Sequence, residues 1–177
     1  MRDYIDNLAP LNIVRMIDMK NGLDGIAASH FNNSRLLHTM LRVHDLQRSL
    51  DFYCRVLGMK LMRLEEYPDG QFTLAFIGYQ EEEDASVIEL TYNWGASDYK
   101  IGNAFGHIAV SVQDVYSVCT VLEDSGVTII RNPGPMKHLS SSGEKPDVIA
   151  FIQDPDGYRI ELIEAQRAFK TQSANIV

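Results

Sequence analysis

The sequence predicts an α+β fold made of two repeated βαβββ modules. Three observations predict it: one stretch recurs in the second half of the chain, each copy is followed by the same order of candidate elements, and both copies end on the same tripeptide. The apolar share of 45% is enough to fill a core in a chain of 177 residues. These features favour one body built by duplication.

The recurring stretch sets the register between the two copies. Its matched residues, all at one constant offset, are His38 with His107, Val43 with Val112 and Asp45 with Asp114. The tripeptides at 75–77 and 88–90 recur at 150–152 and 160–162, where the offset is larger. An offset that changes only between elements indicates duplicated modules with loops of different length.

Each module is predicted to run from one strand through a helix to three more strands. The helices begin at Asp45 and Asp114, which are good N-cap residues, and Gly58 and Gly126 suit the C′ positions that end them. The expected strands are 37–43, 60–65, 73–78 and 87–92 in the first module, and 106–112, 128–131, 148–153 and 158–163 in the second.

Two connections of the second module stand out. The run Asp-Pro-Asp-Gly at 154–157 predicts a tight turn before the last strand. Pro-Gly-Pro at 133–135, followed by a serine-rich stretch at 140–143, predicts a longer loop that is a candidate flap.

The chain is expected to divide into four parts. They are an N-terminal extension at 1–34, to which we assign no role, the first module at 35–98, the second module at 103–168 and a C-terminal tail at 169–177.

Composition argues against several classes of protein. The formal net charge is −8 and no block of Lys and Arg occurs, so nucleic acid is not an expected partner. No apolar run approaches the roughly 20 residues of a membrane span, and no membrane association is expected. Cys54 and Cys119 lie in predicted helices and are expected to be reduced, which predicts a cytoplasmic location.

Each module offers one histidine at its first strand and one glutamate at its last. These residues are His38 and Glu89 in the first module, and His107 and Glu161 in the second. If the first and last strands of a module pair, its imidazole and carboxylate converge, and the two modules together form a His₂Glu₂ metal site. The other histidines, at 30, 44 and 138, have no repeat partner and are interpreted as loop or surface residues.

An ordinary structural role is the alternative for each of these residues. A single histidine in a strand is more often a core or surface residue than a ligand. A carboxylate in an apolar strand is rarer, because leaving it buried and unpaired costs several kcal/mol. Two such carboxylates at matching repeat positions favour a divalent metal, and Ni²⁺, Co²⁺, Zn²⁺, Fe²⁺ and Mn²⁺ all suit the ligand types.

The sequence resembles glyoxalase I of the vicinal-oxygen-chelate superfamily across nearly the whole body, from about 35 to 165. The stretches that carry the resemblance are 36–43, 49–53, 56–60, 88–95, 106–109 and 154–162. The runs Glu-Leu-Thr-Tyr-Asn and Asp-Pro-Asp-Gly-Tyr are the specific ones.

The resemblance implies a metal-dependent lactoylglutathione lyase. Such an enzyme isomerises the hemithioacetal of methylglyoxal and glutathione to S-lactoylglutathione through an enediolate, with His38, Glu89, His107 and Glu161 as metal ligands. It also implies a homodimer, in which the first module of one chain meets the second module of its partner at each site. We expect Glu161 to be the principal base and Glu89 a second acid or base.

The resemblance also implies contacts with glutathione. Arg42 and Asn93 would bind its γ-glutamyl end, and strand alternation independently puts Arg42 on the face of His38 and Asn93 on the face of Glu89. Arg131 and Lys137 fall where longer relatives hold the glycine carboxylate. Zinc-using relatives carry an insertion between the modules that this chain lacks, which favours Ni²⁺ or Co²⁺ over Zn²⁺.

Other functions remain open at this stage. An extradiol dioxygenase of the same superfamily would use iron with two histidines and one carboxylate, and the second glutamate argues against it. A thiol transferase, a non-catalytic binding module and the use of a related thiol such as trypanothione are further alternatives.

Overall fold

The computed structural model describes residues 30, 33–96, 98–138 and 145–164. The chain divides into two units, Met1–Leu36 and Leu37–Val177, and both sheets belong to the second. The N-terminal extension, apart from residues 30, 33 and 34, and the C-terminal tail lie outside the described residues, as does the centre of the candidate flap at 139–144. None of the described helices has the length and apolar composition of a membrane span.

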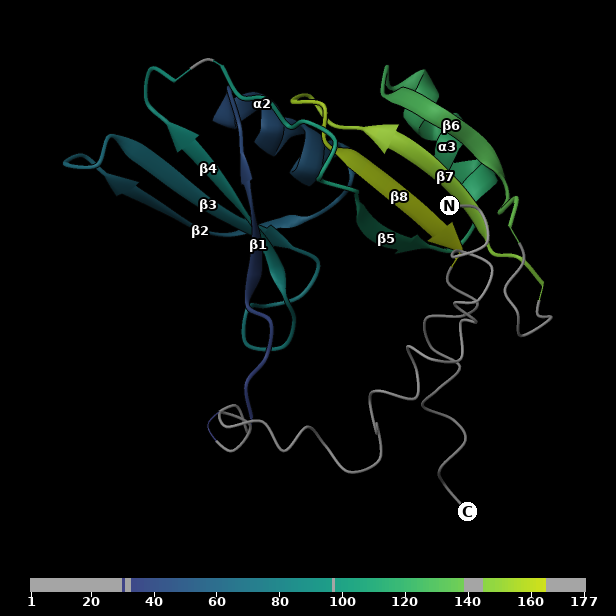
Figure 1. Cartoon of the computed structure of the whole chain (residues 1–177), viewed down its shortest axis with the longest axis horizontal. Helices are drawn as coiled ribbons and strands as arrows, with labels where there is room; N and C mark the ends of the chain where they lie inside the picture. The colour runs from purple at the N-terminus through teal and green to yellow at the C-terminus, as the bar shows by residue number, and fades with distance from the viewer. Residues whose placement is uncertain (1–29, 31–32, 97, 139–144, 165–177) are drawn as a thin grey trace, which may run out of the picture. The chain divides into compact units, whose positions relative to one another are not determined.

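Two four-stranded sheets of identical topology form the body (Figure 1). The first contains β1 (His38–Arg42), β2 (Lys60–Tyr67), β3 (Phe72–Gly78) and β4 (Val87–Asn93), in the order β1-β4-β3-β2. The second contains β5 (Ile108–Val112), β6 (Thr128–Pro135), β7 (Val148–Gln153) and β8 (Arg159–Glu164), in the order β5-β8-β7-β6.

In each sheet the first and last strands are parallel and the remaining pairs are antiparallel. The predicted α+β fold of two βαβββ modules is thereby confirmed.

The helices begin where the sequence predicts. The Asp45 carboxylate accepts a hydrogen bond from the Arg48 backbone N–H at the start of α2 (Leu46–Leu50), and Asp114 caps α3 (Val115–Asp124) in the same way. Both predicted C′ glycines have positive φ, +75° at Gly58 and +79° at Gly126, a conformation that only glycine adopts without strain.

The first helix changes type in its second half. After α2 the chain continues as a π-helix, η2 (Asp51–Val56), in which the Leu57 backbone N–H donates to the Phe52 carbonyl rather than to the carbonyl four residues back. Apolar spacing predicts only that a helix is present here, and the π-turn is a local rearrangement that this spacing does not encode.

One predicted loop is part of a strand. Pro133, Gly134 and Pro135 were expected to leave the sheet, yet they belong to β6, and the last two pair with Ile149 and Val148 of β7. The prediction fails because β6 is an edge strand with an irregular register, where a residue without an N–H donor is tolerated.

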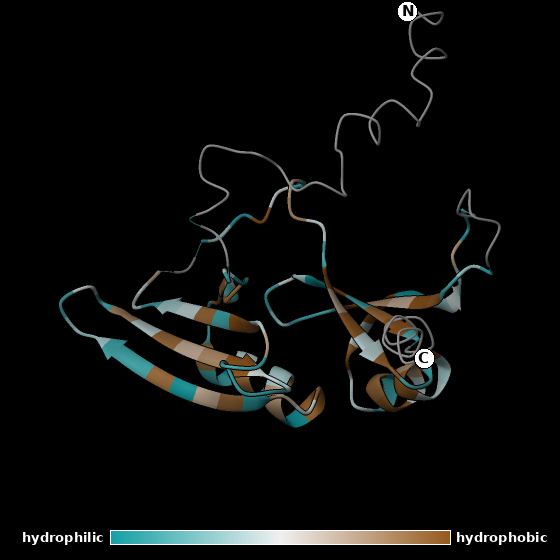
Figure 2. Cartoon of the chain, turned by 90° about the horizontal axis from the view of Figure 1, so that it is seen from below, coloured by the Kyte–Doolittle hydropathy of each residue, from teal (hydrophilic) through white to brown (hydrophobic). Residues whose placement is uncertain are grey.

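One face of each sheet packs against the buried core, and the opposite face carries the candidate site residues. The strands of both sheets carry hydrophobic residues together with hydrophilic ones (Figure 2). Leu90 of β4 and Leu162 of β8 are almost completely buried, and the core cluster also includes Tyr53 and Cys119 from the helical segments. Because neighbouring side chains in a strand point to opposite faces, the residues beside these leucines face away from the core.

Candidate active site

The first module brings His38 and Glu89 together. β1 and β4 are parallel, and Met40 lies opposite Glu89, so the histidine two residues earlier on the same face reaches the carboxylate diagonally. His38 Nε2 lies 3.0 Å from Glu89 Oε2. The histidine side chain is 38% exposed and the glutamate side chain 13% exposed. We call this pair the first half-site.

The second module repeats this geometry. Ala109 of β5 lies opposite Glu161 of β8, and His107, just before β5, reaches the carboxylate from the same diagonal position. His107 Nε2 lies 3.0 Å from Glu161 Oε2, and the two side chains are 42% and 12% exposed. This pair is the second half-site. The strand pairing that the metal hypothesis required is therefore present in both modules.

An aromatic ring supports the imidazole in each half-site. Phe76 packs edge-on against His38 with ring centroids 5.6 Å apart, and Phe151 packs against His107 at 5.3 Å. Each phenylalanine lies directly opposite the glutamate of its half-site on the neighbouring strand. Sequence reasoning gave these rings no role, although both belong to the repeated Ala-Phe-Ile tripeptide.

The half-sites fit two adjacent positions around a divalent metal. Ligand atoms about 2.1 Å from an ion and at right angles to each other are about 3 Å apart, which matches the separation of 3.0 Å in both pairs. A neighbouring hydroxyl also orients one of the predicted ligands: Thr91 Oγ1 donates to Glu89 Oε1 at 2.9 Å.

The four predicted ligands do not meet within one chain. Over the part of the chain that the structure describes, no group of three or more His, Cys, Asp or Glu side chains is close enough to hold a metal ion. The structure thus joins each histidine to the glutamate of its own module and leaves the two half-sites separate.

The two residues expected to bind the γ-glutamyl group are the last residues of β1 and β4. Arg42 is exposed and borders a cavity of about 270 Å³. The cavity is also lined by Met40, Tyr99, Lys100, Phe105 and Tyr158. Asn93 Nδ2 donates a hydrogen bond to the Tyr99 hydroxyl at 2.9 Å. The structure therefore connects both residues to the segment between the modules.

Arg131 contacts backbone in its own sheet. Its Nη1 donates to the Ile149 carbonyl and its Nη2 to the Pro135 carbonyl, both at 2.9 Å, where the register of β6 against β7 is irregular. Arg63 occupies the equivalent place after a register shift in β2, opposite the phenylalanine of the first half-site. These contacts give Arg131 a structural role beside the one predicted for it. Lys137 is exposed beyond the end of β6.

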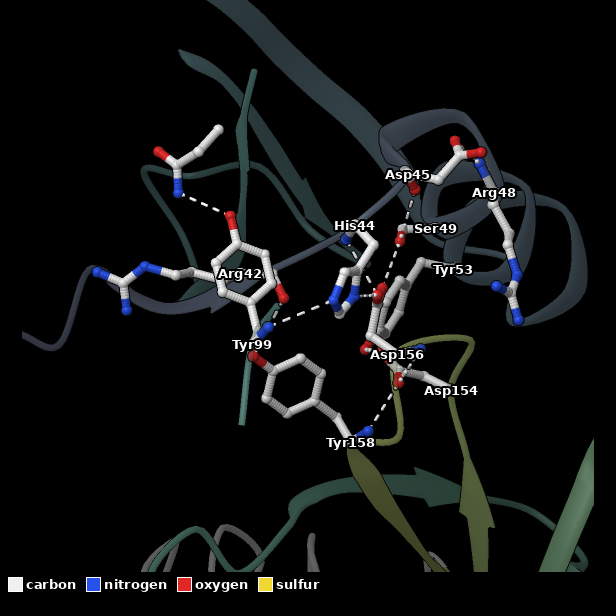
Figure 3. A network of polar contacts seen from close by, with 11 residues as sticks. Arg42, His44, Asp45, Arg48, Ser49, Tyr53, Tyr99, Asp154, Asp156 and Tyr158 are labelled. Carbon is white, nitrogen blue, oxygen red and sulfur yellow. Dashed lines mark hydrogen bonds and ion pairs between the residues drawn. The ribbon is translucent and has the colours of Figure 1, made fainter. Parts of the chain in front are cut away.

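A polar network that the sequence does not indicate joins the modules at the 154–158 turn (Figure 3). Asp156 Oδ1 accepts from the His44 backbone N–H at 3.0 Å and lies 2.6 Å from His44 Nδ1. Ser49 Oγ donates to Asp156 Oδ2 at 3.1 Å, and the Tyr53 hydroxyl donates to Asp154 Oδ2 at 2.7 Å. His44 lies in a loop as expected, but its role is to bind the second module.

Burial shifts the titration of the innermost pair in this network. Desolvation raises the pKa of Asp154 above the usual value for an aspartate, although hydrogen bonds from Tyr53 and from two backbone N–H groups oppose the shift. Desolvation, together with the neighbouring Asp154, also raises the pKa of Tyr53. The phenol is therefore a stable hydrogen-bond donor to the buried carboxylate.

Comparison with known proteins identifies the family of the chain. Residues 35–162 match the family described as the Glyoxalase/Bleomycin resistance protein/Dioxygenase superfamily. A probable lactoylglutathione lyase of Synechocystis sp. is 57% identical over 129 residues, which are 73% of this chain and 94% of that protein. A lactoylglutathione lyase of Neisseria meningitidis is 55% identical over 130 residues, covering 73% and 90% of the two chains.

Solved structures with the same fold include two glyoxalase I enzymes. Glyoxalase I of Zea mays superposes with a TM-score of 0.67 at 44% identity, over 73% of this chain and 44% of that one, so this chain spans less than half of the maize enzyme. The trypanothione-dependent glyoxalase I of Leishmania major superposes with a TM-score of 0.61 at 43% identity, over 73% and 86%. The chain therefore belongs to the glyoxalase I family of lactoylglutathione lyases, within the glyoxalase/bleomycin resistance protein/dioxygenase superfamily.

Proposed function

We propose that the protein isomerises the hemithioacetal of methylglyoxal and glutathione to S-lactoylglutathione, and so removes methylglyoxal. The observation that carries the proposal is the duplicated His–Glu pair with a separation of 3.0 Å, in a chain more than half identical to named lactoylglutathione lyases. A non-catalytic binding module would have no need for two such pairs.

The metal would be held by His38 and Glu89 of one copy with His107 and Glu161 of the other. The separation of the half-sites within one described chain supports this arrangement, because a twofold dimer joins unlike halves and completes two sites at once. Ni²⁺ or Co²⁺ is the proposed ion, and Zn²⁺ is the alternative. When bound, it supplies Lewis-acid chemistry that acidifies the substrate carbon and balances the developing negative charge.

Glu161 is the proposed base. Its carboxylate takes the proton from the carbon between oxygen and sulfur and returns it to the neighbouring carbon. The hydroxyl proton passes to the former ketone oxygen, and the hemithioacetal thereby becomes the thioester. A difference between the half-sites supports this choice. Thr91, two residues after Glu89, fixes that carboxylate by a hydrogen bond, whereas the residue two after Glu161 is Ile163, which has no hydroxyl to donate. The Glu161 carboxylate therefore has one restraint fewer than the Glu89 carboxylate when it moves to accept the substrate proton.

The thiol would be oriented by charge. The Arg42 guanidinium matches a carboxylate, and Asn93 offers an amide beside it. At the glycine end, Lys137 is the better candidate, since two donors of Arg131 already bind backbone carbonyls. The free thiols of Cys54 and Cys119 support the proposed cytoplasmic location.

The test follows thioester formation by ultraviolet absorbance, with methylglyoxal, glutathione and metal-stripped protein. Separate additions of Ni²⁺, Co²⁺ and Zn²⁺ should restore activity, with Ni²⁺ or Co²⁺ most effective. Restoration by Zn²⁺ alone would overturn the choice of ion. No thioester with any ion, from folded protein that still binds metal, would overturn the proposed function, and trypanothione would then replace glutathione as the substrate to assay.

A further inference from the structure

Arg42 and Asn93 both lie at strand ends, and both are contacted by tyrosines from outside their own sheet. Each is the last residue of its strand, β1 and β4. The backbone N–H of the next residue, Val43 or Trp94, still donates to a neighbouring segment of the chain, and beyond that point the regular ladder ends. A side chain that must meet a charged ligand at such a position needs support from elsewhere. In both cases that support comes from the turn at 154–158 of the second module.

The support of Arg42 is direct. The Tyr158 hydroxyl donates to the Arg42 carbonyl at 3.1 Å, where the strand ends. Tyr158 is itself fixed, because its backbone N–H donates to the buried Asp154 carboxylate at 2.7 Å. The Tyr158 ring also packs edge-on against Phe105, with centroids 5.4 Å apart.

The support of Asn93 runs through two rings, those of Tyr99 and His44, which Figure 3 labels. The Tyr99 hydroxyl accepts from Asn93 Nδ2, and the Tyr99 ring packs against the His44 imidazole with centroids 4.9 Å apart. His44 in turn contacts Asp156 through Nδ1 and accepts from the Tyr99 backbone N–H through Nε2 at 3.5 Å. The neutral tautomer with its proton on Nδ1 satisfies both contacts.

We propose that Tyr99 and Tyr158 are positioning residues that present Asn93 and Arg42 to the charged end of the thiol. This inference rests on the proposed function. The γ-glutamyl end of glutathione carries an α-carboxylate and an α-ammonium group. The Arg42 guanidinium pairs with the carboxylate. The Tyr99 hydroxyl holds Nδ2 of Asn93, so the amide oxygen on the opposite side is turned to accept from the ammonium.

The cavity beside Arg42 supports this assignment. It measures about 270 Å³, and both tyrosines lie in its wall together with Lys100. The same two side chains therefore line the space next to the proposed thiol contacts and hold those contacts in place.

The test compares Tyr99→Phe and Tyr158→Phe with Tyr116→Phe, a control at an exposed tyrosine on α3. Each change removes one hydroxyl and keeps the ring. Loss of one hydrogen bond should raise KM for the hemithioacetal about three- to tenfold in the first two variants and leave kcat within about twofold. The Kd of S-methylglutathione for the metal-free protein, measured by calorimetry, should rise by the same factor. The control should match the unaltered protein.

Substrate analogues separate positioning from a general structural role. The unaltered protein should prefer glutathione over its deaminated analogue, and Tyr99→Phe should lose most of that preference. Unchanged KM and Kd in both variants of an active enzyme would overturn the inference, as would a joint fall of kcat and thermal stability. Failure of the unaltered protein to form thioester would instead count against the proposed function.

Discussion

At the residue scale, the two half-sites differ in how the glutamate is held: Thr91 Oγ1 donates to Glu89, whereas Ile163 stands at the equivalent place after Glu161. The repeated histidines and glutamates are visible in the sequence, and strand alternation places each pair on one face. The contrast between Thr91 and Ile163 is also in the sequence, yet its meaning depends on a hydrogen bond that only the structure reveals. The role of His44 could not be predicted, because its partner Asp156 is distant along the chain.

Glu161→Gln should separate proton transfer from metal binding. The amide oxygen of Gln can still face an ion, but the side chain can no longer accept the substrate proton. We expect kcat to fall by at least about a hundredfold with the bound metal retained. Steady-state kinetics and metal analysis of the same sample measure both quantities. Glu89→Gln is the matched variant and should lose less activity. Full activity in Glu161→Gln would exclude Glu161 as the base.

Tyr53→Phe should change how stability depends on pH. At neutral pH the variant should lose about 1–3 kcal/mol, because the buried Asp154 carboxylate loses a donor. Above pH 10 the unfolded chain releases the tyrosine proton, whereas folded Tyr53, whose pKa is raised, keeps it. This residue then lowers the stability of the unaltered protein by about 1.4 kcal/mol per pH unit.

The stability gap between the unaltered protein and Tyr53→Phe should therefore narrow as the pH rises above 10. Urea unfolding at a series of pH values measures the gap, with Tyr116→Phe as a control at an exposed site. A gap that stays constant with pH would contradict the argument.

At the element scale, local chemistry predicts where the helices begin and end, but it does not predict the hydrogen-bond pattern inside them. Asp45 and Asp114 cap their helices because a short carboxylate can reach the first free N–H groups. The edge pairing of Pro135 depends on β7, a separate element, so no local pattern predicts it. The π-turn of η2 is a change of hydrogen-bond step that apolar spacing does not encode. Strand positions were predicted well, with errors confined to strand ends.

Gly126→Ala tests the helix end directly. With φ at +79°, an alanine at this position has to adopt the left-handed backbone conformation, although its Cβ meets no other atom. We expect a loss of about 1 kcal/mol, seen as a lower Tm in thermal unfolding. Gly134→Ala is the control, since that glycine also has open space around it but no positive φ, and should leave stability unchanged or slightly raised. Equal effects of the two changes would refute the conformational explanation.

At the scale of the whole molecule, the repeat predicts the fold, and the resemblance predicts a site shared between two copies. The repeat predicts two modules of the same topology, whereas the contacts between them around Asp154 and Asp156 appear only in the structure. The sequence therefore predicts four candidate ligands, and the described chain keeps them as two separate pairs. This separation is compatible with the site shared between two copies that the resemblance implies.

Mixing two inactive variants tests the shared site. One carries His38→Ala with Glu89→Ala, and the other carries His107→Ala with Glu161→Ala. Refolded together in equal amounts, they should recover about a quarter of the unaltered activity, since half of the dimers are mixed and each mixed dimer has one complete site. Each variant refolded alone is the control. No recovery, with mixed dimers demonstrated by mass, would place each site within a single chain.

The buried hydrogen bond between Tyr53 and Asp154 limits how this protein can be recombined with its relatives. A chimera joined between the modules would unite a helix from one parent with a turn from another. If either parent lacked its half of the pair, a phenol or a carboxylate would be stranded in the interior. Recombination libraries of this family should therefore keep these two positions from the same parent, even though they are far apart in sequence.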